Sequence, residues 1–212
     1  KIVEAHSRAC LYAGVKLGGV NSEVAPGQWE FQVGPCSGVD AGDDLWMARY
    51  ILQRVCELFQ VDVTFDPKPI KGWAGIGCHT NYSTAPTREP DGLEVIKRHC
   101  EKLRVRHTDH VKLYGGGNHR RLTGKDSTMH IDDFSWGVGD RDAAIRIPVR
   151  VASQGYGYYE DRRPAANMDP YLVTGLLVET TLFHQGRRAF SRQVSGSFGI
   201  ELEDPSPQAA KA

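Results

Sequence analysis

The sequence predicts one mixed domain of the α/β or α+β class. Segments with apolar residues at helical spacing alternate along the chain with short segments rich in Val, Ile, Phe and Thr, which are typical of strands. A chain of 212 residues is long enough to bury a sizeable core. The sequence has no internal repeat, which argues against a solenoid.

Four segments are predicted to be helices: residues 2–13, 43–59, 93–111 and 169–183. Gly14 follows the first segment, where a glycine commonly ends a helix. The second is the clearest, because apolar residues recur at helical spacing from Leu45 to Phe59. The fourth begins at Asp169 as the cap, with Pro170 at the first helical position.

Six further segments are predicted to be strands: residues 15–24, 28–34, 61–67, 76–84, 144–151 and 156–160. The helical pattern fades after Gln185, and residues 204–212 (DPSPQAAKA) have the composition of a disordered tail.

Charge and cysteine content exclude several classes of protein. Lys plus Arg and Asp plus Glu are 26 each, so net charge does not favour nucleic acid as a partner. The five cysteines form no CxxC pair, which argues against a disulfide framework or zinc knuckle and for a reducing compartment. The sequence has no run of 18 or more apolar residues, so no membrane span is predicted.

Polar side chains form rows on three of the predicted strands, because side chains two residues apart share a face. The rows are Gln28, Glu30 and Gln32; His79, Asn81 and Ser83; and Tyr158, Glu160 and Arg162. Each row holds one candidate metal ligand (Glu30, His79 or Glu160), and Glu23 lies just upstream. Carboxylates with one imidazole suit a hard divalent cation such as Mg²⁺ or Mn²⁺.

Arginines lie close to these rows in sequence, and guanidinium groups are preferred partners of carboxylate and phosphoryl oxygens. They are Arg120, Arg121, Arg141, Arg146, Arg162 and Arg163. Spacing alone therefore indicates a metal and phosphate site, with solvated strand faces as the alternative. His107 and His110, on a strongly charged helical segment, are predicted to be surface residues.

Four motifs resemble the glutamine synthetase family: NSEVAPGQWEFQVGPC at 21–36, GCHTNYST at 77–84, NHRRLTG at 118–124 and YYEDRRPAANMDPY at 158–171. LWMARYILQRVCE and FDPKPI fall in the same order at compatible spacing. The chain thus resembles the C-terminal catalytic domain of the eukaryotic, plant or algal type of this family, in truncated and divergent form.

The resemblance implies an α+β fold, a half-barrel of mainly antiparallel strands flanked by helices. It covers residues 1–185 as a catalytic domain incomplete at its N-terminus, with the family's small β-grasp domain absent. Residues 186–212 would be a divergent, partly disordered extension. A homo-oligomeric ring in the cytoplasm or a plastid is implied as well.

The resemblance also assigns roles to residues. Metal ligands would be Glu23, Glu30, His79 and Glu160; ATP would be bound by Asn81, Ser83, Arg141, Arg146 and Tyr158; and glutamate or the transferred phosphoryl group would be held by Arg121 and Arg162, with Arg141 also catalytic. The implied reaction uses ATP and Mg²⁺ or Mn²⁺ to form γ-glutamyl phosphate from glutamate, which ammonia then converts to glutamine.

This sequence departs from the family at three places. The family's upstream half, which supplies a further ligand to each metal, is not part of it. The flap after RRLTG reads Lys125-Asp126-Ser127-Thr128, so Ser127 stands where the family has a glutamate that accepts the ammonium proton. The loop at 71–74 is one residue short and lacks the asparagines that help hold glutamate.

Three functions follow from this pattern. The first is an ATP-dependent glutamate–ammonia ligase serving glutamine biosynthesis. The second is a catalytically inactive subunit of a larger complex with a structural or nucleotide-binding role. The third is a nucleotide- or metal-binding sensor on the same scaffold.

Overall fold

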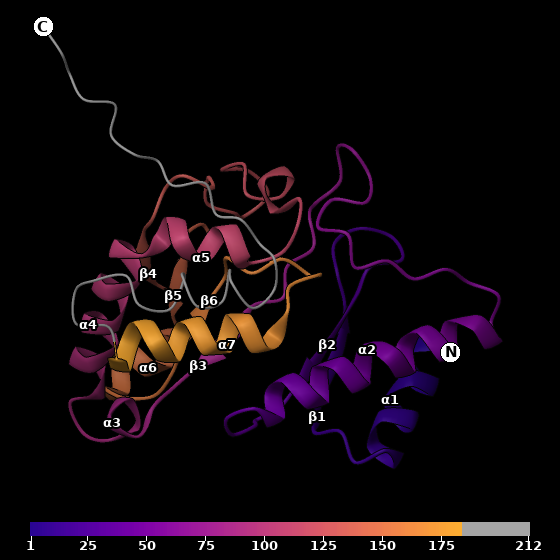
Figure 1. Cartoon of the computed structure of the whole chain (residues 1–212), viewed down its shortest axis with the longest axis horizontal. Helices are drawn as coiled ribbons and strands as arrows, with labels where there is room; N and C mark the ends of the chain where they lie inside the picture. Colours follow the sequence, from indigo (N-terminus) through magenta and orange to yellow (C-terminus); the bar gives the residue numbers. More distant parts are fainter. Residues whose placement is uncertain (184–212) are drawn as a thin grey trace, which may run out of the picture.

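The computed structural model describes residues 1–183 and confirms the α+β class (Figure 1). The helices are α1 (Ile2–Tyr12), α2 (Asp40–Leu58), α3 (Ala85–Arg88), α4 (Gly92–Val105), α5 (His107–Leu113), α6 (Val149–Gln154) and α7 (Pro170–Val178). A 3₁₀ turn spans Asn118–Arg120, and a π-helical turn, Glu179–Phe183, extends α7. The strands are β1 (Leu17–Ser22), β2 (Trp29–Val33), β3 (Thr80–Tyr82), β4 (Trp136–Val138), β5 (Ile145–Ile147) and β6 (Tyr159–Asp161).

The strands form two small sheets rather than one continuous surface. β1 and β2 make an antiparallel hairpin, and the second sheet has the order β3-β6-β5-β4. Its β3–β6 and β5–β6 pairs are antiparallel, whereas β4 and β5 run parallel. Figure 1 shows the hairpin with α1 and α2 on one side of the molecule and the second sheet with α3 to α7 on the other.

The largest core lies between the second sheet and helices α4 and α7. Ile96 and Leu103 from α4 pack with Ile147 of β5 and with Leu176 and Leu177 of α7, all fully buried. This burial of aliphatic side chains fixes the sheet that carries β6. A second, smaller core joins α1 and α2 to the hairpin.

Helix α2 connects the two sides of the molecule. The Arg49 guanidinium donates from Nη1 to the Met168 carbonyl at 2.9 Å and from Nη2 to the Ala166 carbonyl at 2.7 Å. Gly42 lies directly against the Tyr171 ring, whose hydroxyl donates to Asp43. The segment that follows β6 is therefore held by a helix far away in sequence.

The capping prediction for α7 is confirmed. Asp169 Oδ1 accepts from the backbone amides of Tyr171 at 2.8 Å and Leu172 at 3.3 Å, and Pro170 occupies the first helical position. Helix α2 begins at Asp40, earlier than the predicted start at residue 43.

Several sequence-based expectations are wrong. Residues 61–67 form no strand, and their alternating pattern pairs with no strand among residues 1–183. The segment 144–151 is a strand only as far as Ile147, and after Pro148 it continues as α6. The helix predicted over 93–111 is interrupted at Arg106, which separates α4 from α5.

That interruption also overturns the prediction for His107 and His110. Both lie in α5, and they are 5% and 0% exposed. The His107 ring contacts the Ile131 carbonyl, and the His110 ring contacts the Tyr114 and Thr180 hydroxyls, so both are buried residues.

The predicted extension 186–212, including its disordered tail, lies outside the described residues. Within residues 1–183, no helix combines the length and apolar character that crossing a bilayer requires.

Candidate functional site

Strand β6 is the centre of the candidate site, because its register places three predicted site residues side by side. Glu160 pairs with Asn81 of β3 on one flank and with Arg146 of β5 on the other. Residues paired across neighbouring strands share a face. The predicted polar rows of β3 and β6 therefore belong to one surface, which Arg146 extends.

The Glu160 carboxylate contacts two guanidinium groups and one imidazole. It lies 2.6 Å from Arg146 Nε, 3.2 Å from Arg162 Nη1 and 3.3 Å from His79 Nδ1. Burial alone would raise the pKa of Glu160, but contacts with His79, Arg162 and Arg146 outweigh it and lower the pKa to about 2. Glu160 is thus a permanent anion at neutral pH.

His79 lies beside Glu160 as a neutral imidazole. Desolvation lowers its pKa, and the nearby Arg162 and Arg121 charges lower it further against the opposing effect of Glu160. Its side chain keeps 32% exposure. A neutral, partly accessible imidazole and an adjacent carboxylate together make a suitable pair of metal ligands.

Glu23 and Glu30 form a second acidic pair on the β1–β2 hairpin. Asn21 and Glu30 are cross-strand partners, and Glu23 follows where its backbone amide donates to the Gln28 carbonyl at 2.9 Å. Desolvation and then the adjacent Glu30 carboxylate raise the pKa of Glu23. Two adjacent carboxylates are a donor set suited to a hard divalent cation.

The four predicted metal ligands therefore form two pairs, Glu23 with Glu30 and His79 with Glu160. Among residues 1–183, no three His, Cys, Asp or Glu side chains come together as a group able to hold a metal ion. Each pair offers two of the ligands that an octahedral Mg²⁺ or Mn²⁺ site requires.

Arg121 supports the chain that follows β6. Its Nη2 donates to the carbonyls of Arg162, Arg163 and Pro164 at 3.0, 2.8 and 3.1 Å. Burial lowers its pKa to about 10, which leaves the guanidinium charged at neutral pH. Its other terminal nitrogen lies near Gly77 and His79, on the side of the candidate site.

Three predicted residues lie apart from the Glu160 contacts. Arg141 is exposed on the bend between β4 and β5 and makes no hydrogen bond or ion pair within the described part of the chain. Ser83 Oγ accepts from Arg88 Nη1 at 2.9 Å, and Tyr158 is 42% exposed. Their assignment to ATP stays a prediction.

The flap loop, residues 125–128, contacts Arg162. Thr123 and His130 form a β-bridge at its base, and Arg162 Nη2 donates to the Ser127 carbonyl at 3.4 Å. Asp126 and Ser127 both adopt left-handed backbone conformations, with φ of 55° and 56°. The Asp126 carboxylate turns away to Lys68 Nζ, at 3.4 Å.

Asp161 is a buried neighbour of the candidate site that the sequence did not single out. It is fully buried on the opposite face of β6 and pairs with the fully buried Arg163 at 2.7 Å. The available signal was strand alternation, which places a charged residue in the inward row with Tyr159.

Comparison with known proteins gives consistent matches. The sequence model of the family described as "Glutamine synthetase, catalytic domain" matches residues 1–93. The chain is similar to glutamine synthetase of Suillus bovinus, with 59% identity over 182 residues, 85% of this chain and 51% of that protein. It is similar to the Saccharomyces cerevisiae protein of the same name, with 58% identity over 180 residues, 84% of this chain and 49% of that protein.

A plant protein gives the same result. The glutamine synthetase nodule isozyme of Medicago sativa is 58% identical over 182 residues, 85% of this chain and 51% of the isozyme. The chain spans about half the length of the curated relatives it matches.

Proposed function

Because the chain belongs to the glutamine synthetase family, we propose that it carries part of the site of an ATP-dependent glutamate–ammonia ligase. The reaction would join ammonia to glutamate through γ-glutamyl phosphate. Residues 1–185 would form the catalytic portion, and glutamate, ammonium and ATP would be the substrates.

The observation that carries this proposal is the set of contacts around Glu160. An anionic carboxylate lies between Arg146 and Arg162 and against a neutral imidazole on one sheet face. Phosphoryl transfer depends on positioning and on neutralising charge more than on covalent help from the protein. A carboxylate and imidazole for a cation, flanked by guanidinium groups for phosphoryl oxygens, supply these requirements.

The candidate ligands supply part of the coordination shell of a divalent cation. His79 with Glu160 would hold one ion and Glu23 with Glu30 another, while further oxygen ligands would come from water, nucleotide phosphates or portions of the family's chain that this one does not span. A bound Mg²⁺ or Mn²⁺ would orient phosphate oxygens and neutralise their charge. Arg146 and Arg162 meanwhile hold the Glu160 carboxylate toward the site.

The second step of the proposed reaction requires a proton acceptor for ammonium, since only the neutral amine has a lone pair for attack. Ser127 occupies the flap position, and a hydroxyl does not serve as a base near neutral pH. Asp126 does not replace it, because its carboxylate pairs with Lys68 rather than facing Arg162.

This flap favours a second candidate function, an inactive glutamine synthetase-like subunit that binds nucleotide or serves a structural role. The Glu160 contacts support binding of a cation and phosphate, whereas the flap lacks the group for the ammonia step. The two functions differ in turnover and share the binding site.

Substitution of Ser127 separates the two candidates. Ser127→Glu places a carboxylate at the loop position whose carbonyl already accepts from Arg162. General-base help is worth about 10²–10⁴-fold in rate, so we expect the ammonium-dependent release of phosphate from ATP and glutamate to rise by an amount in that range.

Lys125→Glu is the matched control, because it adds the same carboxylate to the same loop at a position away from Arg162. A gain in the Ser127 variant alone supports the ligase with a defective flap. Equal rates in the wild type and both variants would show that Ser127 is not the defect. Binding of ATP and Mn²⁺ without turnover in any variant would favour the inactive subunit.

We also propose a homo-oligomeric assembly, as in the ring implied by the resemblance. Several large apolar side chains of the hairpin side are exposed, among them Tyr12 at 96%, Val24 at 88% and Leu58 at 83%. Exposed apolar side chains mark a contact with another chain where they lie together as one patch, so the proposal predicts that these residues are buried between subunits.

A further inference from the structure

We propose that the buried Asp161–Arg163 pair is a positioning unit that fixes Glu160 and Arg162 in the candidate site. The inference rests on the proposed function and adds two residues that do not contact substrate. Both side chains are 0% exposed, so their effect on the site is transmitted through the backbone.

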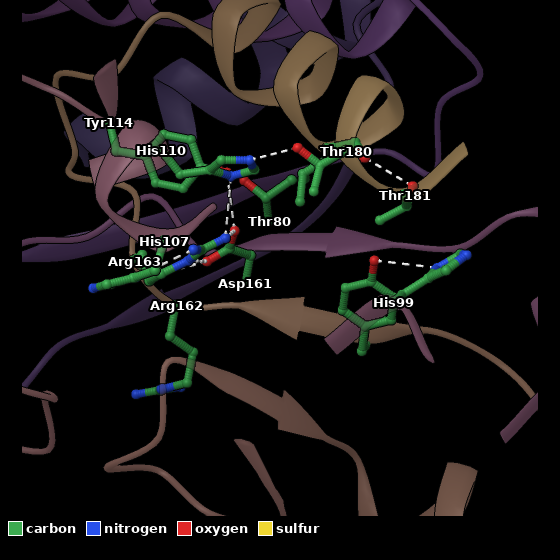
Figure 2. Close-up of polar contacts among 12 residues, drawn as sticks. Thr80, His99, His107, His110, Tyr114, Asp161, Arg162, Arg163, Thr180 and Thr181 are labelled. Atoms are coloured by element: carbon green, nitrogen blue, oxygen red, sulfur yellow. Dashed lines mark hydrogen bonds and ion pairs between the residues drawn. The ribbon is translucent and has the colours of Figure 1, made fainter. Parts of the chain in front are cut away.

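The first observation is the alternation of side chains from Tyr159 to Arg163. Tyr159, Asp161 and Arg163 are directed into the core, and Glu160 and Arg162 face the other way. Figure 2 shows Arg162 on one side of the strand and the Asp161–Arg163 pair on the opposite side. Every residue that faces the site is therefore flanked by residues anchored in the core.

The second observation is a set of bonds that encloses Arg162. Asp161 Oδ1 accepts from the Arg163 backbone amide at 3.0 Å and from Arg163 Nε at 2.9 Å. Asp161 Oδ2 accepts from Arg163 Nη2 at 2.7 Å. The two neighbours of Arg162 thus bind each other through both main chain and side chain, which restricts the backbone dihedrals of Arg162 itself.

The third observation is that the pair is itself held from outside the strand. Tyr114 donates its hydroxyl to Asp161 Oδ2 at 3.1 Å, and its ring lies 5.2 Å below the Arg163 guanidinium. Arg163 Nη1 and Nη2 lie 3.4 Å from His107 Nδ1 and 3.3 Å from His110 Nδ1. His110 in turn contacts the Thr180 hydroxyl at 2.8 Å (Figure 2).

These contacts point to a role beyond stability. Replacing a buried ion pair with apolar side chains of similar volume is often neutral or stabilising, so stability alone does not require this pair. What apolar residues would not supply is the directional bonding across Arg162. Partners behind metal-ligating residues typically change metal affinity by about 10–100-fold when they are altered.

The test compares the wild-type chain with the double variant Asp161→Leu/Arg163→Met, which removes both charges together. We expect an unfolding midpoint in urea close to that of the wild type. We expect Mn²⁺, used alone as the probe in calorimetry, to bind about 10-fold more weakly. The Arg162 amide, which donates to the Ala144 carbonyl at 2.9 Å, should also exchange faster with solvent.

Tyr159→Phe is the matched control, because it changes an inward-facing side chain of the same strand without touching the pair. It should leave both Mn²⁺ affinity and exchange at the Arg162 amide unchanged. If the double variant does not fold, Arg163→Lys keeps the charge but loses the bidentate geometry and should show the same two changes in smaller degree.

Unchanged Mn²⁺ affinity together with unchanged exchange, in the double variant or in Arg163→Lys, would overturn the positioning role. If the wild type itself does not bind Mn²⁺, the proposed function fails, and exchange at the Arg162 amide still decides whether the pair fixes β6.

Discussion

At the scale of single residues, buried imidazoles make stability depend on pH. His99 of α4 is 5% exposed, packs edge-on against the Tyr159 ring and has Nδ1 3.4 Å from the Tyr159 hydroxyl. Burial, followed by the charges of Lys102 and Arg98, lowers its pKa from 6.5 to about 4. The unfolded chain therefore binds more protons at His99 between these two values.

The sign of the resulting prediction follows from linkage. His99 makes no pH-dependent contribution above about pH 6.5, and stability is lost as the pH falls from there toward 4, by at most about 1.4 kcal/mol per pH unit for one proton. His99→Gln should reduce this slope in urea unfolding measured across that range. His119→Gln, a substitution of an exposed histidine, should leave it unchanged; equal slopes for all three proteins would contradict the assignment.

Strand alternation accounts for the contact between two of the candidate site residues, whereas their roles stay predictions. Glu160 and His79 come together because both lie on the faces that a two-residue period assigns to them. Arg141 does not join them, since no local pattern fixes the bend on which it lies. The Glu23–Glu30 pair and the Glu160 contacts form as separate units within the described residues.

At the scale of elements, helix α2 depends on close approach to α7. A Cβ added at Gly42 would lie 2.3 Å from Tyr171 Cε1, far inside van der Waals contact. A Cβ added at Gly175, within α7, would meet nothing within 4 Å. The two helical glycines therefore differ in packing while sharing the same intrinsic propensity.

Alanine substitutions at the two glycines should have opposite effects. Gly175→Ala should stabilise the chain by about 0.5–1 kcal/mol through helix propensity. Gly42→Ala should destabilise it, because an overpacking cost of about 1–3 kcal/mol exceeds that gain. Thermal unfolding of both variants measures the difference; stabilisation by Gly42→Ala would mean that α2 and α7 do not pack as described.

The elements that the sequence predicted correctly are those with strong local signals. The cap at Asp169 and the apolar spacing of α2 are local and appear as expected. The interruption at Arg106 has no such signal, since the apolar spacing continues through it. The break accompanies a tertiary contact instead, the burial of His110 against Tyr114 and Thr180. The strand predicted at 61–67 fails for the converse reason, because alternation does not provide a partner.

At the scale of the whole molecule, Arg49 joins the hairpin side to the segment after β6. Its guanidinium binds two carbonyls, lies 5.1 Å from the Trp46 ring centroid and 5.5 Å from that of Phe65, and is 5% exposed. Both carbonyl partners lie in the loop between β6 and α7. No local pattern predicts such a contact, since its partners are more than a hundred residues away.

Arg49→Met should therefore cost about 2–6 kcal/mol of unfolding free energy, because two buried carbonyls lose their donors at about 1–3 kcal/mol each. Arg54→Met on the same helix removes an exposed ion pair with Glu57 and should cost no more than about 1 kcal/mol. Urea denaturation of the two variants gives the comparison. Equal losses would show that Arg49 is no more important than a surface charge.

The opposed faces of Tyr159–Arg163 bear on how variants in this short stretch are interpreted. Under the proposed function, a substitution in the core-facing row and one in the row that faces the candidate site would both lower activity, for unrelated reasons. Loss of activity here does not identify a group that touches substrate. Variants of this segment are best compared by measuring both activity and backbone order. The measure of backbone order distinguishes a substitution in the core-facing row from one in the row that faces the candidate site.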